Sequence, residues 1–486
     1  MSSYFTDLAQ QYIDGEWRPG TGSWDIIDLN PYDGEKLASI TIATVDEVDQ
    51  AYQAAARAQK AWAATNAYAR RAVFEKVLRL IEDREQEIAE VIIAELGGTG
   101  LKAAFELHLA KEFLRESIHL ALRPEGRIIP SPVDGKENRV YRVPVGVVGV
   151  ISPFNFPFLL SLKSVAPALA LGNAVVLKPH QDTPIVGGTL VAKLFEDAGL
   201  PAGLLNVVLT DVAEIGDAFI EHPVPRVISF TGSDKVGRHV ATVCAAQFKR
   251  VILELGGNSA LVVLDDADID YAVDAAVFSR YVHQGQVCMA ANRVLVDRSI
   301  ADEFTEKFVA KVRSLKAGDP RDPRTVIGPL INSSQAEAVS GTVQQAIAEG
   351  ATALVHGTTT DNLVEPSVLT DVPADSPLLR QEIFGPVAFL IPFDGEEEAV
   401  RLVNDTPYGL SGAVHTGDIE RGVRFAQQID TGMFHVNDGT VHDEPLVPFG
   451  GEKNSGVGRL NGETTLDAFT TTKWISVQHG RSGFPF

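Results

Sequence analysis

Apolar positions along the chain follow two different periods. Between about residues 46 and 121 they recur every three or four positions, which is typical of helices with one buried face. From residue 144 onward, short continuous apolar runs alternate with further helical stretches, which is typical of buried parallel strands. The predicted helices of the first region are 46–63, 67–96 and 101–121. The predicted strands that follow are 146–151, 174–177, 205–209, 226–230 and 250–253, with helices at about 158–171, 184–198, 212–221 and 233–247.

A second alternating region begins near residue 260 and continues to about 437. Its first units are a strand at 260–264, a helix at 268–282, a strand at 293–297 and a helix at 299–316. Two successive regions of this kind predict an α/β protein with a Rossmann-type doubly wound sheet followed by a second α/β domain. Ligands in such folds bind beyond the carboxyl ends of the strands.

Three further segments lack the alternating pattern. Asp14-Gly15 predicts the tip of a short hairpin, because this dipeptide tolerates the positive φ of a tight turn. Residues 124–142 predict another hairpin around Asp134-Gly135, and 466–486 a strand with an irregular tail. Neither of these last two segments has a core of its own, so we expect them to be arms that pack on another part or another subunit.

Composition narrows the class of protein. The chain has 486 residues, 45% hydrophobic and 22% charged, which predicts a globular protein of two or three domains. A net charge of −22 argues against nucleic acid and anionic membranes as partners. Two cysteines predict neither a disulfide framework nor a metal site, and no apolar run approaches the ~18 residues of a membrane span. The N-terminal stretch lacks the basic and apolar regions of a secretory signal, so we predict a cytoplasmic protein.

Three residues are candidates for catalysis. Cys288 lies on a bend of small residues between a predicted helix and strand, where a thiolate could act as nucleophile; the alternative is a buried, inert cysteine. Asn155 follows a strand, where its amide could donate to an oxyanion or merely cap the next helix. Glu254 interrupts an apolar strand, so it is either a general base with a raised pKa or one half of a salt bridge.

Other strand ends carry candidate cofactor-binding residues. Lys178 ends a strand and could reach a ribose or a phosphate, although a solvated strand end is the alternative. Gly232 and Ser233 open a helix, where free backbone N–H groups could bind a pyrophosphate. Glu382 stands beside an aromatic residue and a Gly-Pro turn, and alone indicates no more than a surface loop.

In combination these stretches resemble the aldehyde dehydrogenase superfamily along essentially the whole chain. The matching motifs, in order, are Pro153-Phe-Asn-Phe-Pro157, Leu177-Lys-Pro179, Phe230-Thr-Gly-Ser233, Leu253-Glu-Leu-Gly-Gly-Asn258, Gly285-Gln-Val-Cys288, Glu382-Ile-Phe-Gly-Pro386 and Pro448-Phe-Gly-Gly-Glu-Lys-Asn-Ser-Gly456. The resemblance implies an NAD(P)-binding domain, a catalytic domain and a β arm that joins subunits into a homodimer or homotetramer. The implied bounds are 1–121 and 145–254 for the cofactor domain, 255–453 for the catalytic domain, and 122–144 with 466–486 for the arms.

The resemblance also implies a role for each motif residue. Cys288 would attack the aldehyde carbonyl, and the resulting oxyanion would be held by the Asn155 amide and the N–H of Cys288. Glu254 would activate the water that hydrolyses the thioester. The residues implied to bind NAD or NADP are Lys178, Gln181, Gly232, Ser233, Glu382 and Phe384. Many NAD-preferring relatives carry glutamate at the position of Gln181, so we expect both NAD and NADP to work here.

Two stretches, Tyr281–Met289 and Asn155–Pro167, resemble the benzaldehyde and vanillin dehydrogenase branch of the superfamily. The implied substrate is an aromatic aldehyde in an apolar slot, although the same side chains could be ordinary core residues. The residues of this slot are Phe158, Val287, Met289 and Phe449, with Lys163 near its mouth. Three alternatives stay open: a semialdehyde dehydrogenase using Lys163 or Arg293, a thiol esterase, and a catalytically silent family member.

Overall fold

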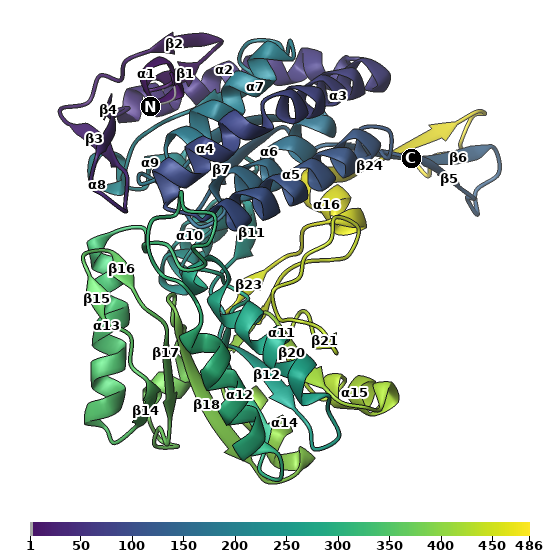
Figure 1. Cartoon of the computed structure of the whole chain (residues 1–486). Helices are drawn as coiled ribbons and strands as arrows, with labels where there is room; N and C mark the ends of the chain where they lie inside the picture. The colour runs from purple at the N-terminus through teal and green to yellow at the C-terminus, as the bar shows by residue number, and fades with distance from the viewer. Residues whose placement is uncertain (1–2) are drawn as a thin grey trace.

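The computed structural model describes residues 3–486, and its core consists of two large β-sheets with helices around each (Figure 1). The first sheet has the strand order β2-β1-β9-β8-β7-β10-β11-β23. Its strands are β1 (Gln11–Ile13), β2 (Glu16–Arg18), β7 (Val147–Ile151), β8 (Ala174–Lys178), β9 (Leu205–Val207), β10 (Val227–Thr231), β11 (Arg250–Glu254) and β23 (Gly456–Val457). The five strands from β9 to β11 are parallel, as their continuous apolar sequences predict.

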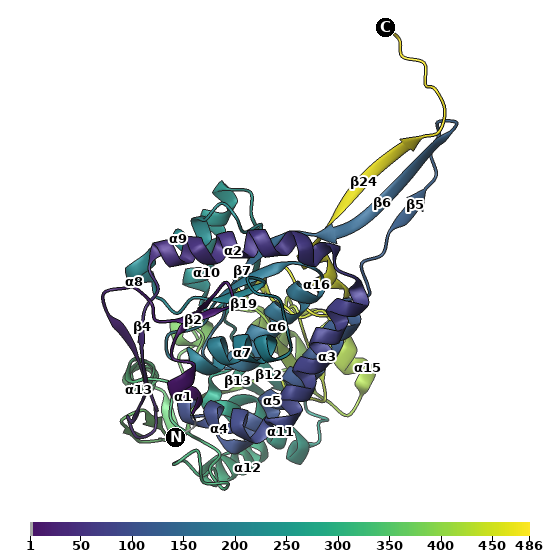
Figure 2. The same ribbon diagram turned by 90° about the horizontal axis from the view of Figure 1, so that it is seen from above.

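Helices from the N-terminal half of the chain surround this sheet in Figures 1 and 2. Helix α5 packs along α6, and α2 along β8. The helices of this half are α1 (Tyr4–Asp7), α2 (Val45–Ala64), α3 (Ala67–Asp83), α4 (Glu85–Leu96), α5 (Gly100–Leu120), α6 (Pro157–Ala170), η1 (Ile185–Thr189), α7 (Leu190–Asp197), α8 (Val212–Ile215), α9 (Ala218–Glu221) and α10 (Asp234–Ala246). The doubly wound arrangement predicted from the sequence is therefore present.

The second sheet has the order β14-β17-β18-β13-β12-β20-β21 and is parallel except at β14. Its strands are β12 (Ser259–Val263), β13 (Ala291–Asp297), β14 (Thr352–Val355), β17 (Ser367–Thr370), β18 (Val387–Phe393), β20 (Gly412–His415) and β21 (His435–Val436). The helices of the C-terminal half of the chain are α11 (Ile269–Tyr281), η2 (Val282–Gly285), α12 (Ala301–Arg313), α13 (Ser333–Ala348), η3 (Pro377–Arg380), α14 (Glu396–Asn404), α15 (Ile419–Ala426) and α16 (Gly462–Phe469). Small two-stranded sheets pair β3 (Asp25–Leu29) with β4 (Lys36–Thr41), β15 (Thr359–Thr360) with β16 (Leu363–Val364), and β19 (Tyr408–Gly409) with β22 (Glu452–Lys453).

A three-stranded antiparallel arm extends away from the body, with the C-terminus beyond its tip (Figure 2). It consists of β5 (Arg127–Ile129), β6 (Lys136–Pro144) and β24 (Thr470–Gln478), in the order β24-β6-β5. The pairing joins residues more than 300 positions apart, from Pro144 opposite Thr470 to Lys136 opposite Gln478. Ile128 and Trp474 on this arm are 72% and 65% exposed, which is unusual for large apolar side chains.

Four sequence predictions differ from the structure. The helix predicted at 67–96 is two helices, because Arg84 leaves helical geometry (φ −113°, ψ 18°) between α3 and α4. The helix predicted at 212–221 breaks at Gly216 (φ 52°) into α8 and α9. The helix predicted at 184–198 opens with the π-helical turn η1, and residues 466–469 belong to α16, so β24 begins only at Thr470.

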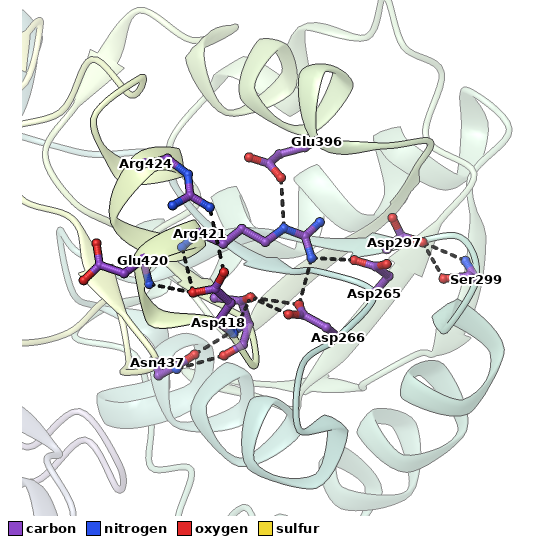
Figure 3. A network of polar contacts seen from close by, with 11 residues as sticks. Asp265, Asp266, Asp297, Ser299, Glu396, Asp418, Glu420, Arg421, Arg424 and Asn437 are labelled. Carbon is purple, nitrogen blue, oxygen red and sulfur yellow. Dashed lines mark hydrogen bonds and ion pairs between the residues drawn. The ribbon is translucent and has the colours of Figure 1, made fainter.

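Ion pairs hold the carboxyl ends of strands β12 and β20 in the second sheet together (Figure 3). Arg421 of α15 donates from Nη1 to Asp265 at 2.7 Å and to Asp266 at 3.0 Å, and from Nε to Glu396 at 3.0 Å. These acceptors follow β12 or open α14, so one guanidinium joins three segments. This arginine offsets the charge of a cluster of carboxylates at the edge where a parallel sheet commonly binds a ligand.

None of the helices formed by residues 3–486 is both long enough and apolar enough to cross a membrane. The N-terminal stretch used to predict the absence of a secretory signal begins with residues 1–2, which lie outside the described residues.

Candidate active site

A cavity of about 930 Å³ opens at the carboxyl ends of β7, β8, β10 and β11. In the strand order, β8 lies on one side of β7 and β10 on the other, so the chain changes winding direction between β7 and β10. Such a switch point separates the loops that follow two neighbouring strands and creates a crevice for a ligand. The predicted site residues that line the cavity are Asn155, Lys178, Gln181, Gly232, Ser233, Glu254, Cys288, Glu382 and Phe384.

Asn155 connects the end of β7 to the loop that carries Cys288. Its side chain is 4% exposed, and its Nδ2 donates to the carbonyl oxygen of Gln286 at 2.9 Å. The alternative that Asn155 caps α6 is wrong, because the N-cap of this helix is Phe156. One amide hydrogen therefore fixes Asn155 two residues before the cysteine, and the second hydrogen remains for another acceptor.

The backbone just before Cys288 has an uncommon conformation. His283, Gln284 and Gly285 have φ values of 49°, 56° and 74°, which are positive in three consecutive residues. Non-glycine residues with positive φ are uncommon, so surrounding contacts must hold them in place. The buried amide of Gln284 donates to the carbonyl oxygens of Gly97 at 3.3 Å and Pro329 at 2.9 Å and so anchors this segment.

Arg280 connects the cysteine loop to the loop that carries Glu382. The residue is 0% exposed, and its Nη2 donates to the carbonyl oxygens of Gly285, Ile383 and Gly385 at 3.0, 3.1 and 2.6 Å. Its Nη1 donates to Asn292 Oδ1. One buried guanidinium thus bonds both to the backbone just after Glu382 and to the backbone of the cysteine bend.

Burial and two nearby carboxylates determine the titration of the Cys288 sulfur. Burial, together with the nearby charges of Glu382 and Glu254, raises the pKa of the Cys288 thiol to about 12, while Lys163 acts in the opposite direction. A thiol with this pKa is protonated at neutral pH. The other cysteine, Cys244, is 0% exposed within α10 and does not line the cavity, as expected for a packing residue.

Glu254 ends β11 with its carboxylate in the same cavity. The residue is 7% exposed, and neither carboxylate oxygen has a hydrogen-bond partner among residues 3–486. Burial raises the pKa of Glu254 to about 8. No salt bridge to Glu254 forms within the described part of the chain, which is contrary to the alternative of a structural ion pair.

Lys178 and Glu382 line the cavity, and the pKa of each side chain is shifted from its ordinary value. Burial lowers the pKa of the Lys178 ammonium to about 8, while Asp211 acts to raise it. Burial raises the pKa of Glu382 to about 7, and its Oε1 accepts a hydrogen bond from the N–H of Gly257 at 3.0 Å. Perturbed groups of both signs in one cleft are typical of a functional site.

The prediction of free N–H groups at Gly232 and Ser233 needs a correction. The Gly232 N–H is not free, because it donates to the carbonyl oxygen of Glu254 at 3.0 Å as β10 continues to pair with β11. Ser233 is the N-cap of α10, and its hydroxyl accepts from the N–H of Val236 at 3.4 Å. The cavity therefore meets the start of a capped helix of 13 residues, where the helix dipole favours an anion.

Comparison with known proteins identifies the family. Residues 17–475 match the aldehyde dehydrogenase family. The chain belongs to the aldehyde dehydrogenase family. It is 58% identical to the benzaldehyde dehydrogenase YfmT of Bacillus subtilis over 99% of both chains, and 48% identical to a vanillin dehydrogenase of Corynebacterium glutamicum over 97% of this chain and 98% of that one. The structure of a salicylaldehyde dehydrogenase from Pseudomonas putida G7, complexed with salicylaldehyde, is also similar, with a TM-score of 0.94 and 36% identity over 98% of this chain and 99% of that one.

The five residues predicted to form an aromatic slot do not line the large cavity of this aldehyde dehydrogenase. Phe158 is 0% exposed within α6, and Val287, Met289 and Phe449 are buried in the same core cluster. Lys163 does not lie at an open mouth, because its side chain is 2% exposed and its Nζ is 2.6 Å from Asp443 Oδ2. The local sequence around Lys163 could not reveal this partner, which is 280 residues away.

Two residues of the cavity, Phe154 and His180, were not predicted from the sequence. Phe154 and His180 both line it, and their rings meet edge-on with centroids 5.3 Å apart. The Phe154 ring also meets Phe384 at 5.7 Å. Phe154 stands directly beside the predicted residue Asn155, and His180 directly beside the predicted residue Gln181. Neighbouring positions in the loops after β7 and β8 were therefore the available signal.

We expect Arg280→Met to destabilise the aldehyde dehydrogenase by about 3 kcal/mol, because buried carbonyls and the Asn292 amide oxygen would lose their donor. The thermal unfolding midpoint should fall by several degrees, and Arg280→Lys, which keeps the charge, should recover part of the loss. Arg321→Met is a matched control, because the Arg321 side chain is 56% exposed and its ion pairs lie at the surface. Equal midpoints for Arg280→Met and Arg321→Met would contradict the structural role of Arg280.

Proposed function

We propose that the chain oxidises an aromatic aldehyde of the benzaldehyde or vanillin type to its carboxylic acid with NAD or NADP. The observation that carries the proposal is the convergence of Cys288, Glu254 and Asn155 on one cavity from three distant parts of the sequence. The substrate class is supported by the names of similar proteins, which are benzaldehyde, vanillin and salicylaldehyde dehydrogenases.

Residues of the cavity fit a dinucleotide. Its volume of about 930 Å³ is at the upper end for small-molecule sites, and it lies at the switch point where dinucleotides bind in related folds. Lys178 and Glu382 would bind the riboses, Ser233 and the start of α10 the pyrophosphate, and Phe384 the nicotinamide side. When bound there, oxidised NAD(P) supplies a hydride acceptor and a positive charge that favours the Cys288 thiolate.

Cys288 would begin the reaction by forming a bond from its sulfur to the aldehyde carbon. The carbonyl π electrons move to oxygen, giving a thiohemiacetal oxyanion. The second Nδ2 hydrogen of Asn155 and the backbone N–H of Cys288 would stabilise this oxyanion, which is the usual electrostatic contribution in carbonyl chemistry. Departure of a hydride from the same carbon, to the acceptor that NAD(P) would supply, would restore the carbonyl and leave a thioester on Cys288.

Glu254 would then act as the general base for hydrolysis. Its unpaired, buried carboxylate removes a proton from water as the water oxygen attacks the thioester carbon. The carbon–sulfur bond breaks, the acid departs and Cys288 regains its thiolate. A pKa of about 8 is close to neutral pH, so Glu254 can accept a proton from water and release it again afterwards.

Contacts of the basic residues disfavour the semialdehyde alternative. Arg293 donates to the backbone carbonyls of Leu402, Asn258 and Val403 at 2.6, 2.9 and 3.1 Å, so its charge is used within the core. Lys163 is paired with Asp443. Neither cation is available as the counter-charge that an aliphatic acid-aldehyde would need, which leaves the neutral aromatic substrate as the better fit.

The arm supports a homodimer or homotetramer. Its exposed apolar side chains, among them Ile128 and Trp474, would be covered by a second copy of the chain. We place the enzyme in the cytoplasm, where its two free cysteines would stay reduced.

A substrate panel tests the proposed function. Formation of reduced cofactor should be fastest with benzaldehyde or vanillin and much slower with succinate semialdehyde, because the pocket offers no free cation. Hydrolysis of a benzoyl thioester without cofactor, and no oxidation of any aldehyde, would instead support an esterase. Absence of all activity from folded protein would support a silent family member.

We expect NADP to replace NAD with a modest loss, because neutral Gln181 would neither bind the 2′-hydroxyl as a carboxylate does nor repel a 2′-phosphate. Gln181 is exposed at the cavity, so Gln181→Glu should leave the fold unchanged and lower kcat/KM for NADP about tenfold or more relative to NAD. Steady-state kinetics with both cofactors provide the measurement. If wild-type protein does not use NADP at millimolar concentration, the proposal about Gln181 fails.

The pH dependence should report Glu254. Its folded pKa is raised to about 8 by burial, so the basic form gains population as pH rises through that value. We expect thioester hydrolysis to increase between about pH 7 and 9 and then level off. Glu254→Gln should lose this rise and show one rapid turnover of reduced cofactor per site, measured by stopped flow. Normal steady-state turnover by this variant would exclude a general-base role.

A further inference from the structure

A buried ion pair lies where α5 packs along α6. Lys102 is 1% exposed and Glu106 is 0% exposed, and the Nζ of Lys102 donates to Oε2 of Glu106 one helical turn later. Moving two charges from water into a protein interior is costly, and apolar side chains of similar volume often stabilise a fold equally well. The proposed mechanism uses neither residue, so the pair has no assigned role at the active site.

Glu106 caps the start of α6, which directly follows Asn155. The first N–H groups of a helix have no partner within the helix, and Phe156 at the N-cap supplies no side-chain acceptor. Instead, Glu106 Oε1 accepts a hydrogen bond from the N–H of Leu159 at 3.1 Å. The first turn of α6 is thereby fixed to α5, and with it the backbone from which the Asn155 amide reaches the Gln286 carbonyl oxygen.

His283 connects this capped turn to the cysteine bend. Its buried ring meets the Phe156 ring edge-on with centroids 5.4 Å apart, and Lys102 Nζ lies 4.6 Å from the centroid of the same Phe156 ring. Burial lowers the pKa of the His283 imidazole well below its ordinary value, and the charge of Lys102 acts in the same direction, while the backbone of Asn155 opposes them. The ring is therefore neutral at neutral pH and packs beside the Asn155 loop.

The turn that precedes α5 holds the cysteine bend through its backbone. The amide of Gln284, next to His283, donates to the Gly97 carbonyl oxygen at 3.3 Å. A Cβ atom built on Gly98 would lie 3.0 Å from Cδ of Lys102, so the lysine stem packs closely on this turn. Residues 97–106 therefore contact both loops that carry the reacting groups, the one with Asn155 and the one with Cys288.

We propose that Lys102, Glu106 and His283 form a positioning cluster, which sets the place of the Asn155 amide relative to the Cys288 sulfur; this inference rests on the proposed function. None of the three residues lines the large cavity, so they act through Asn155 and not on the substrate. An oxyanion donor is effective only at hydrogen-bond distance from the developing charge, and a displacement of about 1 Å can lower a rate about a hundredfold.

The first test replaces the ion pair without leaving a lone charge. The double variant Lys102→Met with Glu106→Leu keeps a similar volume, so the fold should be retained, but it removes the acceptor for the Leu159 N–H. With benzaldehyde and NAD, the rate constant of the first turnover should fall about tenfold or more, measured by stopped flow as formation of reduced cofactor. The Kd for NAD should change less than about twofold, because the cluster does not line the cavity.

A conservative double variant separates the cap from the charges. Lys102→Met with Glu106→Gln is also neutral, but the glutamine keeps an oxygen that can accept from the Leu159 N–H. This variant should recover most of the first-turnover rate that the leucine variant loses. Equal rates for the two double variants would contradict the role of the cap.

A double-mutant cycle with Asn155→Ala tests whether the cluster acts through Asn155. Once the Asn155 amide is absent, replacing the ion pair should slow the first turnover no more than about twofold further, because the displaced group is already gone. A role in the fold alone would instead multiply the two losses.

His283→Asn provides a test that leaves the ion pair intact. Asparagine tolerates the φ of 49° at this position, so the backbone conformation is retained while the ring is removed. The first turnover should slow about fivefold or more, again without further loss in the Asn155→Ala background. Lys111→Met is the matched control: Lys111 is also on α5, but its partner Glu85, at 2.8 Å, belongs to α4, so the rate should be unchanged.

Two outcomes would overturn the inference and leave the proposed function standing. They are wild-type first-turnover rates in the folded leucine double variant and in His283→Asn, and losses that multiply with the loss of Asn155→Ala. If the leucine double variant does not fold, His283→Asn and its combination with Asn155→Ala decide the question alone. If Asn155→Ala oxidises benzaldehyde at the wild-type rate, the oxyanion role in the proposed function fails instead.

Discussion

The buried guanidinium of Arg280 is the contact on which the geometry of the site depends. It bonds to backbone carbonyls of the cysteine bend and of the Glu382 loop, two segments about 100 residues apart in the chain. Burial lowers the pKa of Arg280 to about 10, so the group remains charged at neutral pH and its hydrogen bonds are charge-assisted. The three consecutive residues with positive φ before Cys288 are maintained because this arginine and Gln284 bond to the backbone around them.

The electrostatics of the cavity follow from the same burial. Glu254 and Glu382 are both placed near the sulfur, and burial raises the pKa of each carboxyl group and of the thiol together. Adding a positive charge to such a site favours the ionised form of every one of these groups. The nearby cation of the protein, Lys163, is paired with Asp443, so its effect on the sulfur is partly cancelled. A positively charged ligand bound in this cavity would therefore lower the pKa of the two carboxyl groups and of the thiol.

Sequence patterns predicted the α/β fold and the family, and both are confirmed. They worked where the signal is local: an apolar run ends, and the next polar residue stands at the carboxyl edge of a parallel sheet, as Asn155, Lys178 and Glu254 do. They failed where the partner is remote. The hydrogen bond from the Gly232 N–H to the Glu254 carbonyl oxygen and the ion pair of Lys163 with Asp443 both depend on tertiary contacts. The break at Arg84 has neither glycine nor proline to mark it. Individual catalytic roles stay predictions.

The central claim is that Cys288 carries the substrate through a thioester that Glu254 removes. The most direct measurement is mass spectrometry of peptides from Glu254→Gln protein after incubation with benzaldehyde and NAD. We predict one benzoyl group attached to the peptide that contains Cys288, in an amount equal to the reduced cofactor formed. Reduced cofactor without any acylated cysteine, or a benzoyl group on Cys244 instead, would contradict the account.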